Sequence, residues 1–250
     1  MDAEELNRRA ITTGVPRAVI EKDYALSVVL MHLSNSALAE KMVFKGGTAL
    51  KKAYFPNARF SEDLDFSVLA VNEAEILKEL KRMFEGKELN GVSFIALEKE
   101  KTRAGLRAAL KFSFILSLPQ RIRFDFSFRE NLFLKPEEKL IVDEYGLGEM
   151  RIRLIPLEEL FAKKIHALFC RTAVRDLYDV WCLFKRGIKL RNELVEKKFS
   201  HYHEKDEPSG LKERAESFRQ DWKKDLRQFM KQVPDFDMVV NETVGFLNDS

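Results

Sequence analysis

The spacing of apolar side chains changes twice along the chain. Residues 15–40 carry an apolar stripe at the period of an α-helix. Later segments have the composition and alternation of β-strands, namely 64–69, 92–97, 112–118 and 122–128. Pro119 and Gln120 are expected to form the turn between the last two of these strands. Helical spacing then returns in the segments 157–170, 175–186 and 211–231.

This order of periods predicts an α+β fold in two domains. We expect residues 1–150 to form a domain around a mixed sheet, and residues 151–250 to form a helical C-terminal domain. Within the second domain, residues 200–210 are polar and contain Pro208 and Gly210, which predicts a break between helices.

Composition narrows the class of protein. Of the 250 residues, 45% are hydrophobic, which supplies a sizeable core and excludes disorder for most of the chain. The N-terminus is acidic where a secretory signal is basic, and the best apolar run, 25–33, is too short to span a bilayer. Cys170 and Cys182 lack CxxC spacing and are expected to be reduced core residues. We therefore expect a cytoplasmic protein with no membrane partner. The net charge of +3 is too small to indicate a nucleic-acid partner.

Asp63 and Asp65 are candidate metal ligands. They flank Leu64 at the start of an expected strand, so a period of two places both carboxylates on one face. Adjacent carboxylates repel each other, and a hard divalent cation such as Mg²⁺ or Mn²⁺ relieves that repulsion. The alternative interpretation is a solvated acidic strand edge.

Asp125 is a candidate third ligand. In RIRFDFSF it is the polar-face residue of a strand whose other face is aromatic and aliphatic. A third carboxylate on a neighbouring strand would complete a two-metal site for an in-line displacement. The alternative is a structural Asp paired with Arg123 or Arg129.

A double glycine precedes the acidic strand. Gly46, Gly47 and Thr48 follow an apolar run and precede a helical segment, so they are expected at a helix N-terminus. Backbone N–H groups there favour phosphate, and glycine permits its close approach. Nearby side chains that could add phosphate contacts are Lys45, Arg59 and Ser61.

Several motifs occur together and in order: EKDY at 21–24, FKGGT at 44–48, RFSEDLD at 59–65, LEELFAKKIHAL at 157–168 and RDLYDVWCL at 175–183. This set resembles the AbiEii/AbiGii toxin family of the nucleotidyltransferase superfamily, over roughly residues 20–186. The resemblance implies a polymerase-β-like fold and transfer of a nucleotide from a nucleoside triphosphate. It also implies Asp63 and Asp65 as metal ligands, Gly47 and Thr48 on the triphosphate, and a cognate antitoxin encoded nearby.

The resembled family also carries a Lys in its middle helix and an Asp shortly after it. On a helical wheel Lys164 lies within the apolar stripe of 157–170, whereas Lys163 lies at its edge. In the next helix Asp176 lies on the inner face, and Asp179 lies one step round. We therefore expect Lys164 and Asp176 to act in the catalytic cleft. The alternatives are a helix-start Asp that favours the helix dipole, or an ion pair that only docks the two helices.

Related toxins add nucleotides to the 3′ end of tRNA, so the first functional hypothesis is a toxin that modifies RNA. The segment 211–231 supports it with a basic face of six residues: Arg214, Arg219, Lys223, Lys224, Arg227 and Lys231. The second hypothesis keeps the chemistry but has a small-molecule or protein acceptor. The third is a non-catalytic nucleotide-binding module. The sequence leaves the preferred nucleotide and the oligomeric state open.

Overall fold

The computed structural model describes residues 1–102, 105–129, 131–171, 173–202 and 210–249. The chain divides into two compact units. The first unit comprises Met1–Glu130 and Pro136–Ile155, and the second comprises Asn131–Lys135 and Pro156–Ser250. The boundary expected at residue 150 therefore falls inside the first unit.

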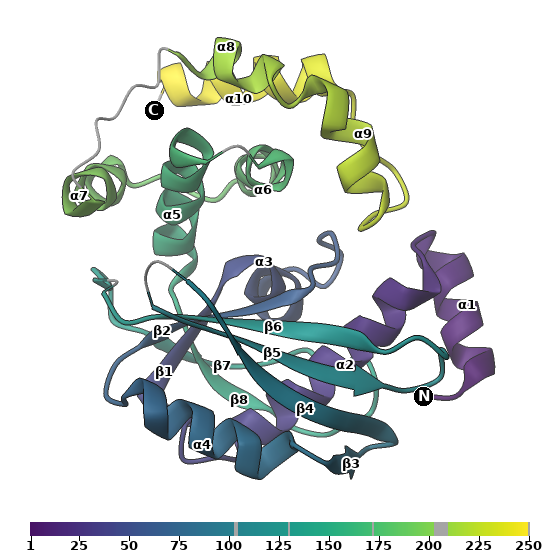
Figure 1. Ribbon diagram of the computed structural model, residues 1–250. Helices are drawn as coiled ribbons and strands as arrows, with labels where there is room; N and C mark the ends of the chain where they lie inside the picture. Colours follow the sequence, from purple (N-terminus) through teal and green to yellow (C-terminus); the bar gives the residue numbers. More distant parts are fainter. Residues whose placement is uncertain (103–104, 130, 172, 203–209, 250) are drawn as a thin grey trace. The chain divides into compact units, whose positions relative to one another are not determined.

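A mixed sheet of eight strands is the centre of the first unit among its described residues (Figure 1). The strand order is β3-β4-β5-β6-β2-β1-β8-β7. The strands are β1 (Met42–Lys45), β2 (Asp63–Val68), β3 (Lys87–Leu89), β4 (Val92–Glu100), β5 (Leu106–Ser113), β6 (Gln120–Ser127), β7 (Glu137–Leu140) and β8 (Arg151–Leu154). β2 pairs in parallel with β6, and β1 with β8, while the other neighbours are antiparallel. The predicted fold class is confirmed.

Helices cover both faces of this sheet. They are α1 (Ala3–Thr13), α2 (Arg17–Ser34), the 3₁₀ turn η1 (Ala39–Lys41), α3 (Gly46–Ala49) with its π-helical continuation η2 (Leu50–Tyr54), and α4 (Glu73–Phe84). Residues of α2 and α4, such as Leu30 and Leu80, share one buried cluster with Phe66 and Phe126 of the sheet. In Figure 1, α4 lies below the sheet and α3 lies above it. The candidate polar residues of β2 and β6 alternate with these core residues and therefore lie on the α3 side.

The second unit is helical among its described residues. Its helices are α5 (Leu157–Cys170), α6 (Val174–Lys185), α7 (Asn192–Tyr202), α8 (Leu211–Glu216), α9 (Arg219–Arg227) and α10 (Phe236–Asp249). α5 packs against α6 and α7, and α6 packs against α9 and α10. The apolar stripe expected on 211–231 is buried, since Phe218, Trp222, Leu226 and Phe229 are each at most 6% exposed.

Some sequence-based boundaries were wrong. The helix expected over 15–40 ends at Ser34. The strand expected over 112–118 is β5, which ends at Ser113, because the backbone N–H of Leu116 donates to the Glu21 carboxylate instead of to a strand partner (2.6 Å). The helix expected over 211–231 is divided into α8 and α9. Tight turns keep the apolar side chains at helical spacing, so the sequence pattern did not reveal the division.

Two further expectations concern the second unit. Cys170 is exposed and only Cys182 is buried, so the prediction that both are core residues was wrong for Cys170. Of the break expected over 200–210, residues 203–209 lie outside the described residues.

No described helix has both the length and the apolar character that a membrane span requires.

Candidate functional site

The double glycine lies directly against the first acidic strand. Gly46 follows β1 and begins α3 with a φ of +82°, a conformation that glycine adopts without strain. A Cβ atom on Gly46 would lie 2.0 Å from Oδ2 of Asp65, so only a glycine leaves room for this carboxylate. The turn and the carboxylate therefore occupy one place in the fold.

The next two residues of the turn contact the segment that leads into β2. A Cβ atom on Gly47 would lie 2.9 Å from Oγ of Ser61 and 3.2 Å from a guanidinium nitrogen of Arg59. The hydroxyl of Thr48 donates to the backbone carbonyl of Asp63 at 2.5 Å. Tertiary contacts thus bring the candidate phosphate-binding residues together with the candidate metal ligands.

A row of charged residues crosses the sheet on the same face. Lys45 is in register with Asp65, and Asp65 is in register with Asp125 on the parallel neighbour β6. Asp125 is in turn in register with Arg107 of β5. The two central carboxylates are therefore flanked by two cations. Lys45 also donates to the hydroxyl of Ser127 at 2.9 Å, which directs its ammonium group over β6.

Asp125 has a specific partner that the sequence did not indicate. Arg107 donates to its Oδ2 from Nη2 at 2.7 Å and from Nε at 3.2 Å, and this hydrogen bonding raises the pKa of Arg107. The paired-Asp interpretation expected Arg123 or Arg129 in this position. Arg107 was missed because the strand was expected to begin at residue 112, although the alternation of LRAAL already starts at Leu106.

The donor set at β2 suits a hard cation. Asp63 and Asp65 are half-buried on one face of the strand and offer carboxylate oxygens, which Mg²⁺ and Mn²⁺ prefer. Among the described residues no three His, Cys, Asp or Glu side chains gather in a metal-binding group. Two carboxylates therefore fit a cation, whereas Asp125 is held by Arg107 and its role as a third ligand stays a prediction.

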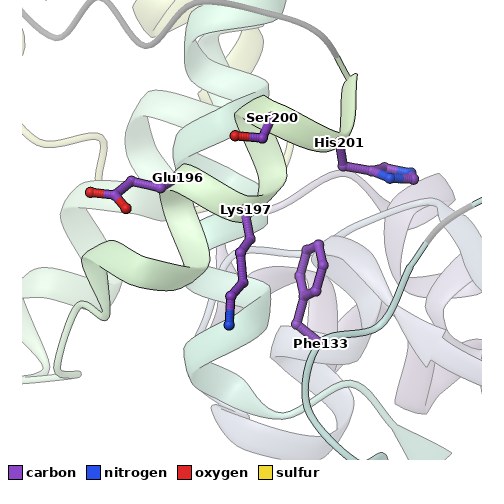
Figure 2. Close-up of a pocket in the computed structure, with 5 residues that line it drawn as sticks. All are labelled: Phe133, Glu196, Lys197, Ser200 and His201. Atoms are coloured by element: carbon purple, nitrogen blue, oxygen red, sulfur yellow. The ribbon is translucent and has the colours of Figure 1, made fainter.

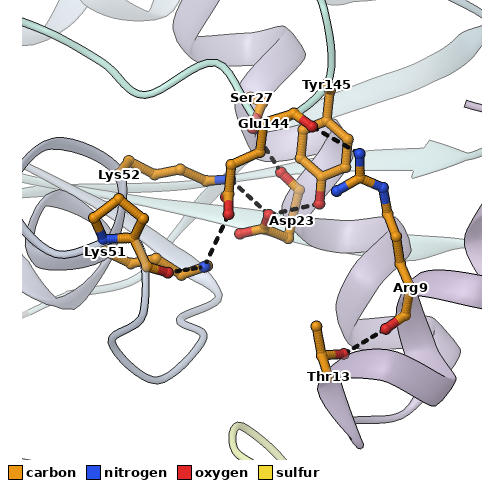
Figure 3. A network of polar contacts seen from close by, with 9 residues as sticks. Arg9, Thr13, Asp23, Ser27, Lys51, Lys52, Glu144 and Tyr145 are labelled. Carbon is orange, nitrogen blue, oxygen red and sulfur yellow. Dashed lines mark hydrogen bonds and ion pairs between the residues drawn. The ribbon is translucent and has the colours of Figure 1, made fainter.

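A buried polar network anchors the helical segment that follows the double glycine (Figure 3). Lys52 of η2 is fully buried and forms ion pairs with Asp23 of α2 at 2.6 Å and with Glu144 at 3.2 Å. The hydroxyl of Tyr145 donates to the same carboxylate oxygen of Asp23 at 2.7 Å, and burial followed by the charge of Asp23 raises the pKa of Tyr145. The EKDY motif therefore supports the position of the glycine turn.

The second unit carries the predicted lysine and its partners. Lys164 of α5 is 7% exposed, and its ammonium group lies 3.0 Å from Asp176 and 2.7 Å from Asp179, both on α6. Lys163 is more exposed, as the helical wheel predicted. Arg171 also binds Asp176, at 2.7 Å. Burial raises the pKa of Asp176, but Lys164 and Arg171 outweigh that effect and hold its pKa below the ordinary value.

The expected basic face of 211–231 is smaller than the sequence suggested. Arg214 donates to the backbone carbonyl of Leu168, and Arg219 forms ion pairs with Glu216 and Asp237. The exposed cations that remain are Lys223, Lys224, Arg227 and Lys231.

The chain matches a known protein family over most of its length. Residues 28–242 match the family described as "Nucleotidyl transferase AbiEii toxin, Type IV TA system". No curated protein matched the chain significantly.

Two solved structures have a similar fold. The nucleotidyltransferase toxin MenT4 from Mycobacterium tuberculosis H37Rv is 21% identical, with a TM-score of 0.76 over 100% of this chain and 90% of its own. A putative nucleotidyltransferase from H. pylori is also 21% identical, with a TM-score of 0.59 over 94% of this chain and 95% of its own.

Proposed function

Because the chain belongs to the AbiEii family of nucleotidyl transferase toxins of type IV toxin–antitoxin systems, we propose that it transfers a nucleotide from a nucleoside triphosphate to an RNA acceptor such as the 3′ end of tRNA. One observation carries the proposal. The glycine turn and the Asp-Leu-Asp strand interlock, with Gly46 lacking room for any side chain next to Asp65. A triphosphate on the turn would therefore lie beside the two carboxylates.

Each residue of the turn has a distinct task in this proposal. The backbone N–H groups of Gly46 and Gly47 bind phosphate oxygens. For the hydroxyl of Thr48 to join them, it must give up its hydrogen bond to the carbonyl of Asp63. The ammonium group of Lys45 lies on the same face as Asp65 and supplies positive charge. Arg59 and Ser61, packed behind Gly47, keep the turn in place.

Asp63 and Asp65 would hold a divalent cation, Mg²⁺ or Mn²⁺. Held there, such a cation would supply positive charge to the transferred phosphoryl group. For Asp125 to join as a third ligand, its carboxylate must share or leave the hydrogen bonds from Arg107. A two-metal mechanism therefore requires either that the Arg107 side chain moves away, or that Asp125 binds the cation while it still accepts from Arg107.

Lys164 and Asp176 are included as residues that transfer requires. Burying a lysine with two carboxylates carries a large desolvation penalty. The pKa of Asp176 is shifted, and groups with shifted pKa values occur more often at functional sites than elsewhere. The alternative, an ion pair that docks α5 onto α6, predicts an effect of substitution on stability alone.

The acceptor is proposed to be RNA because of the exposed cations of α9. Lys223, Lys224 and Arg227 lie on one short helix and are suited to phosphate groups of a nucleic acid. The family implies an antitoxin as a further partner.

The proposal is tested by incubating the protein with total cellular RNA, each labelled nucleoside triphosphate in turn, and Mg²⁺. We expect label in RNA, loss of labelling with a chelator, and recovery with added Mg²⁺ or Mn²⁺. Asp65→Asn should abolish labelling without lowering the melting temperature, because it removes one of two repelling carboxylates. Glu88→Gln, which removes an exposed carboxylate from the edge strand β3, is the control and should be as active as the wild type.

Other outcomes would redirect the assignment. Label in a small molecule or in protein would favour the second hypothesis for the acceptor. Binding of triphosphate without any turnover would favour a non-catalytic module. Full activity of Asp65→Asn would remove Asp65 from the metal site.

A further inference from the structure

A pocket of about 450 Å³ lies within the second unit, between α7 and the segment 131–135 (Figure 2). This volume falls in the range of small-molecule sites, roughly 300–1,000 Å³. Its lining residues are Phe133, Glu196, Lys197, Ser200 and His201. The last four form two pairs spaced by one helical turn on α7, Glu196 with Ser200 and Lys197 with His201, so one helix supplies all the polar groups.

A buried ion pair holds Phe133 in place. Glu159 and Lys198 are 0% and 1% exposed and lie 2.7 Å apart. Glu159 also accepts hydrogen bonds from the backbone N–H groups of Phe133 at 2.9 Å and of Leu134 at 2.8 Å. Lys198 donates to the backbone carbonyl of Asn131 at 3.0 Å. Because a buried charge pair is retained only when its geometry is well satisfied, these bonds fix the segment, and with it the aromatic ring.

Two ammonium groups lie near the ring, and that of Lys198 is already paired with Glu159. The ammonium group of Lys198 lies 4.8 Å from the ring centroid of Phe133, and that of Lys197 lies 6.0 Å from it. Figure 2 shows the ring between Lys197 and His201, while the carboxylate of Glu196 points away from the ring. The amide of Asn131 lies 3.3 Å from Nδ1 of His201, which orients the imidazole beside the pocket.

We propose that this pocket binds one nucleotide of a single-stranded RNA, with its base stacked on Phe133 and its phosphate at Lys197. An aromatic ring beside a cation is the combination by which proteins hold single-stranded nucleic acid without reading its sequence. The hydroxyl of Ser200 and the imidazole of His201 supply further hydrogen-bonding groups for phosphate or sugar oxygens. This inference rests on the proposed function for the identity of the ligand, because RNA is the acceptor there. It adds a second contact surface for that RNA.

The test is a binding measurement with the whole protein. A labelled single-stranded RNA oligonucleotide is titrated without triphosphate, by fluorescence anisotropy, at several salt concentrations. Phe133→Leu should weaken binding by roughly 5- to 150-fold, which is the fold-change that a stacking contribution of about 1–3 kcal/mol represents. Phe133→Tyr retains the ring and should bind like the wild type. Equal affinity of Phe133→Leu and the wild type would overturn the proposal.

Lys197→Gln tests the phosphate contact. Its slope of log affinity against log salt should be less steep by about 0.7, the contribution of one phosphate in a single strand. Lys189→Gln removes an exposed lysine that does not line the pocket and should keep the wild-type slope. An unchanged slope for Lys197→Gln would remove that residue from the site.

Further measurements distinguish binding of a free nucleotide from binding of a strand. They also distinguish failure of the pocket proposal from failure of the proposed function. If adenosine monophosphate also loses affinity in Phe133→Leu, the pocket accepts a free nucleotide as well as a strand, and the stacking proposal stands. If Phe133→Leu binds RNA normally while the protein still labels RNA, the pocket proposal fails alone. If the wild type labels no RNA but binds it through Phe133, the proposed function fails and the pocket remains.

Discussion

Replacing Gly46 with alanine tests whether catalysis depends on the close contact between the glycine turn and Asp65. The effect on catalysis can be told apart from the effect on the stability of the fold. The new Cβ would lie 2.0 Å from Oδ2, 2.8 Å from Cγ and 3.0 Å from Cβ of Asp65. Ordinary van der Waals contact begins at 3.4 Å, so the carboxylate must retreat by more than about 1 Å. A misplacement of about 1 Å at a reacting centre can cost roughly 10²-fold in rate. We therefore expect kcat for nucleotide transfer to fall by about two orders of magnitude in Gly46→Ala.

The backbone cost of this substitution can be measured separately. An L-residue in the left-handed region costs about 1–2 kcal/mol, and Gly46 has a φ of +82°. Gly86 has a φ of +69° and no atom within 4 Å of an added Cβ, so Gly86→Ala bears a comparable strain without the collision. For a chain of this size 1 kcal/mol corresponds to a shift in Tm of about 2–4 °C. Both variants should therefore melt several degrees below the wild type.

The assay is transfer of labelled nucleotide under conditions where both variants are folded. Gly86→Ala should keep the wild-type kcat, and Gly46→Ala should not. If the two variants have the same activity within a few-fold, the contact between Gly46 and Asp65 does not position a functional carboxylate. The contact between the glycine turn and Asp65 would then no longer support the proposed function.

Three further predictions concern the second unit. Lys164→Ala should lower transfer far more than Lys163→Ala. It should also cost about 3–5 kcal/mol of stability, because it leaves two buried carboxylates with less positive charge. Equal activity and equal melting temperature of the two variants would contradict this. The pKa of Asp176 is held below its ordinary value, so its contribution to stability is present above an unfolded pKa of about 3.9 and is lost as pH falls below it. Asp176→Asn should therefore flatten the decline in unfolding free energy at acid pH, and an unaltered acid limb would refute the assignment. The last prediction replaces three cations of α9 with Glu, namely Lys223, Lys224 and Arg227. The slope of log RNA affinity against log salt should become less steep by about 2, while triphosphate binding is unchanged. A wild-type slope would place the acceptor elsewhere.

Periodicity identified the elements whose two faces differ most in polarity. The helix expected over 157–170 coincides with α5, and the expected strand 122–128 nearly coincides with β6, since both have one apolar and one polar face. β1 was not recognised because all four of its residues are buried, so it shows an apolar run without alternation. β7 was missed for the opposite reason, because it is a short, mostly exposed edge strand with a polar sequence.

Local sequence was sufficient to name the candidate residues, because motif spacing and the period of two or 3.6 specify which side chains share a face. It predicted that Asp63 and Asp65 lie together and that Lys164 points inward from α5. The partner of Asp125 could not be predicted in this way, because Arg107 lies on another strand and the contact depends on strand register. Only the register of β5, β6 and β2 places Arg107 on Asp125 and Asp125 beside Asp65.

The same reasoning applies to the segment 131–135. In sequence it follows the strand expected over 122–128, and nothing in its composition assigns it to the helical unit. Burial of Glu159 and Lys198 makes that assignment, because each buried charge requires hydrogen-bond partners and the backbone of this segment provides them. Sequence thus determines which chemical groups the chain can offer, whereas the tertiary fold decides which of them meet, since burial penalises every polar group that remains unsatisfied.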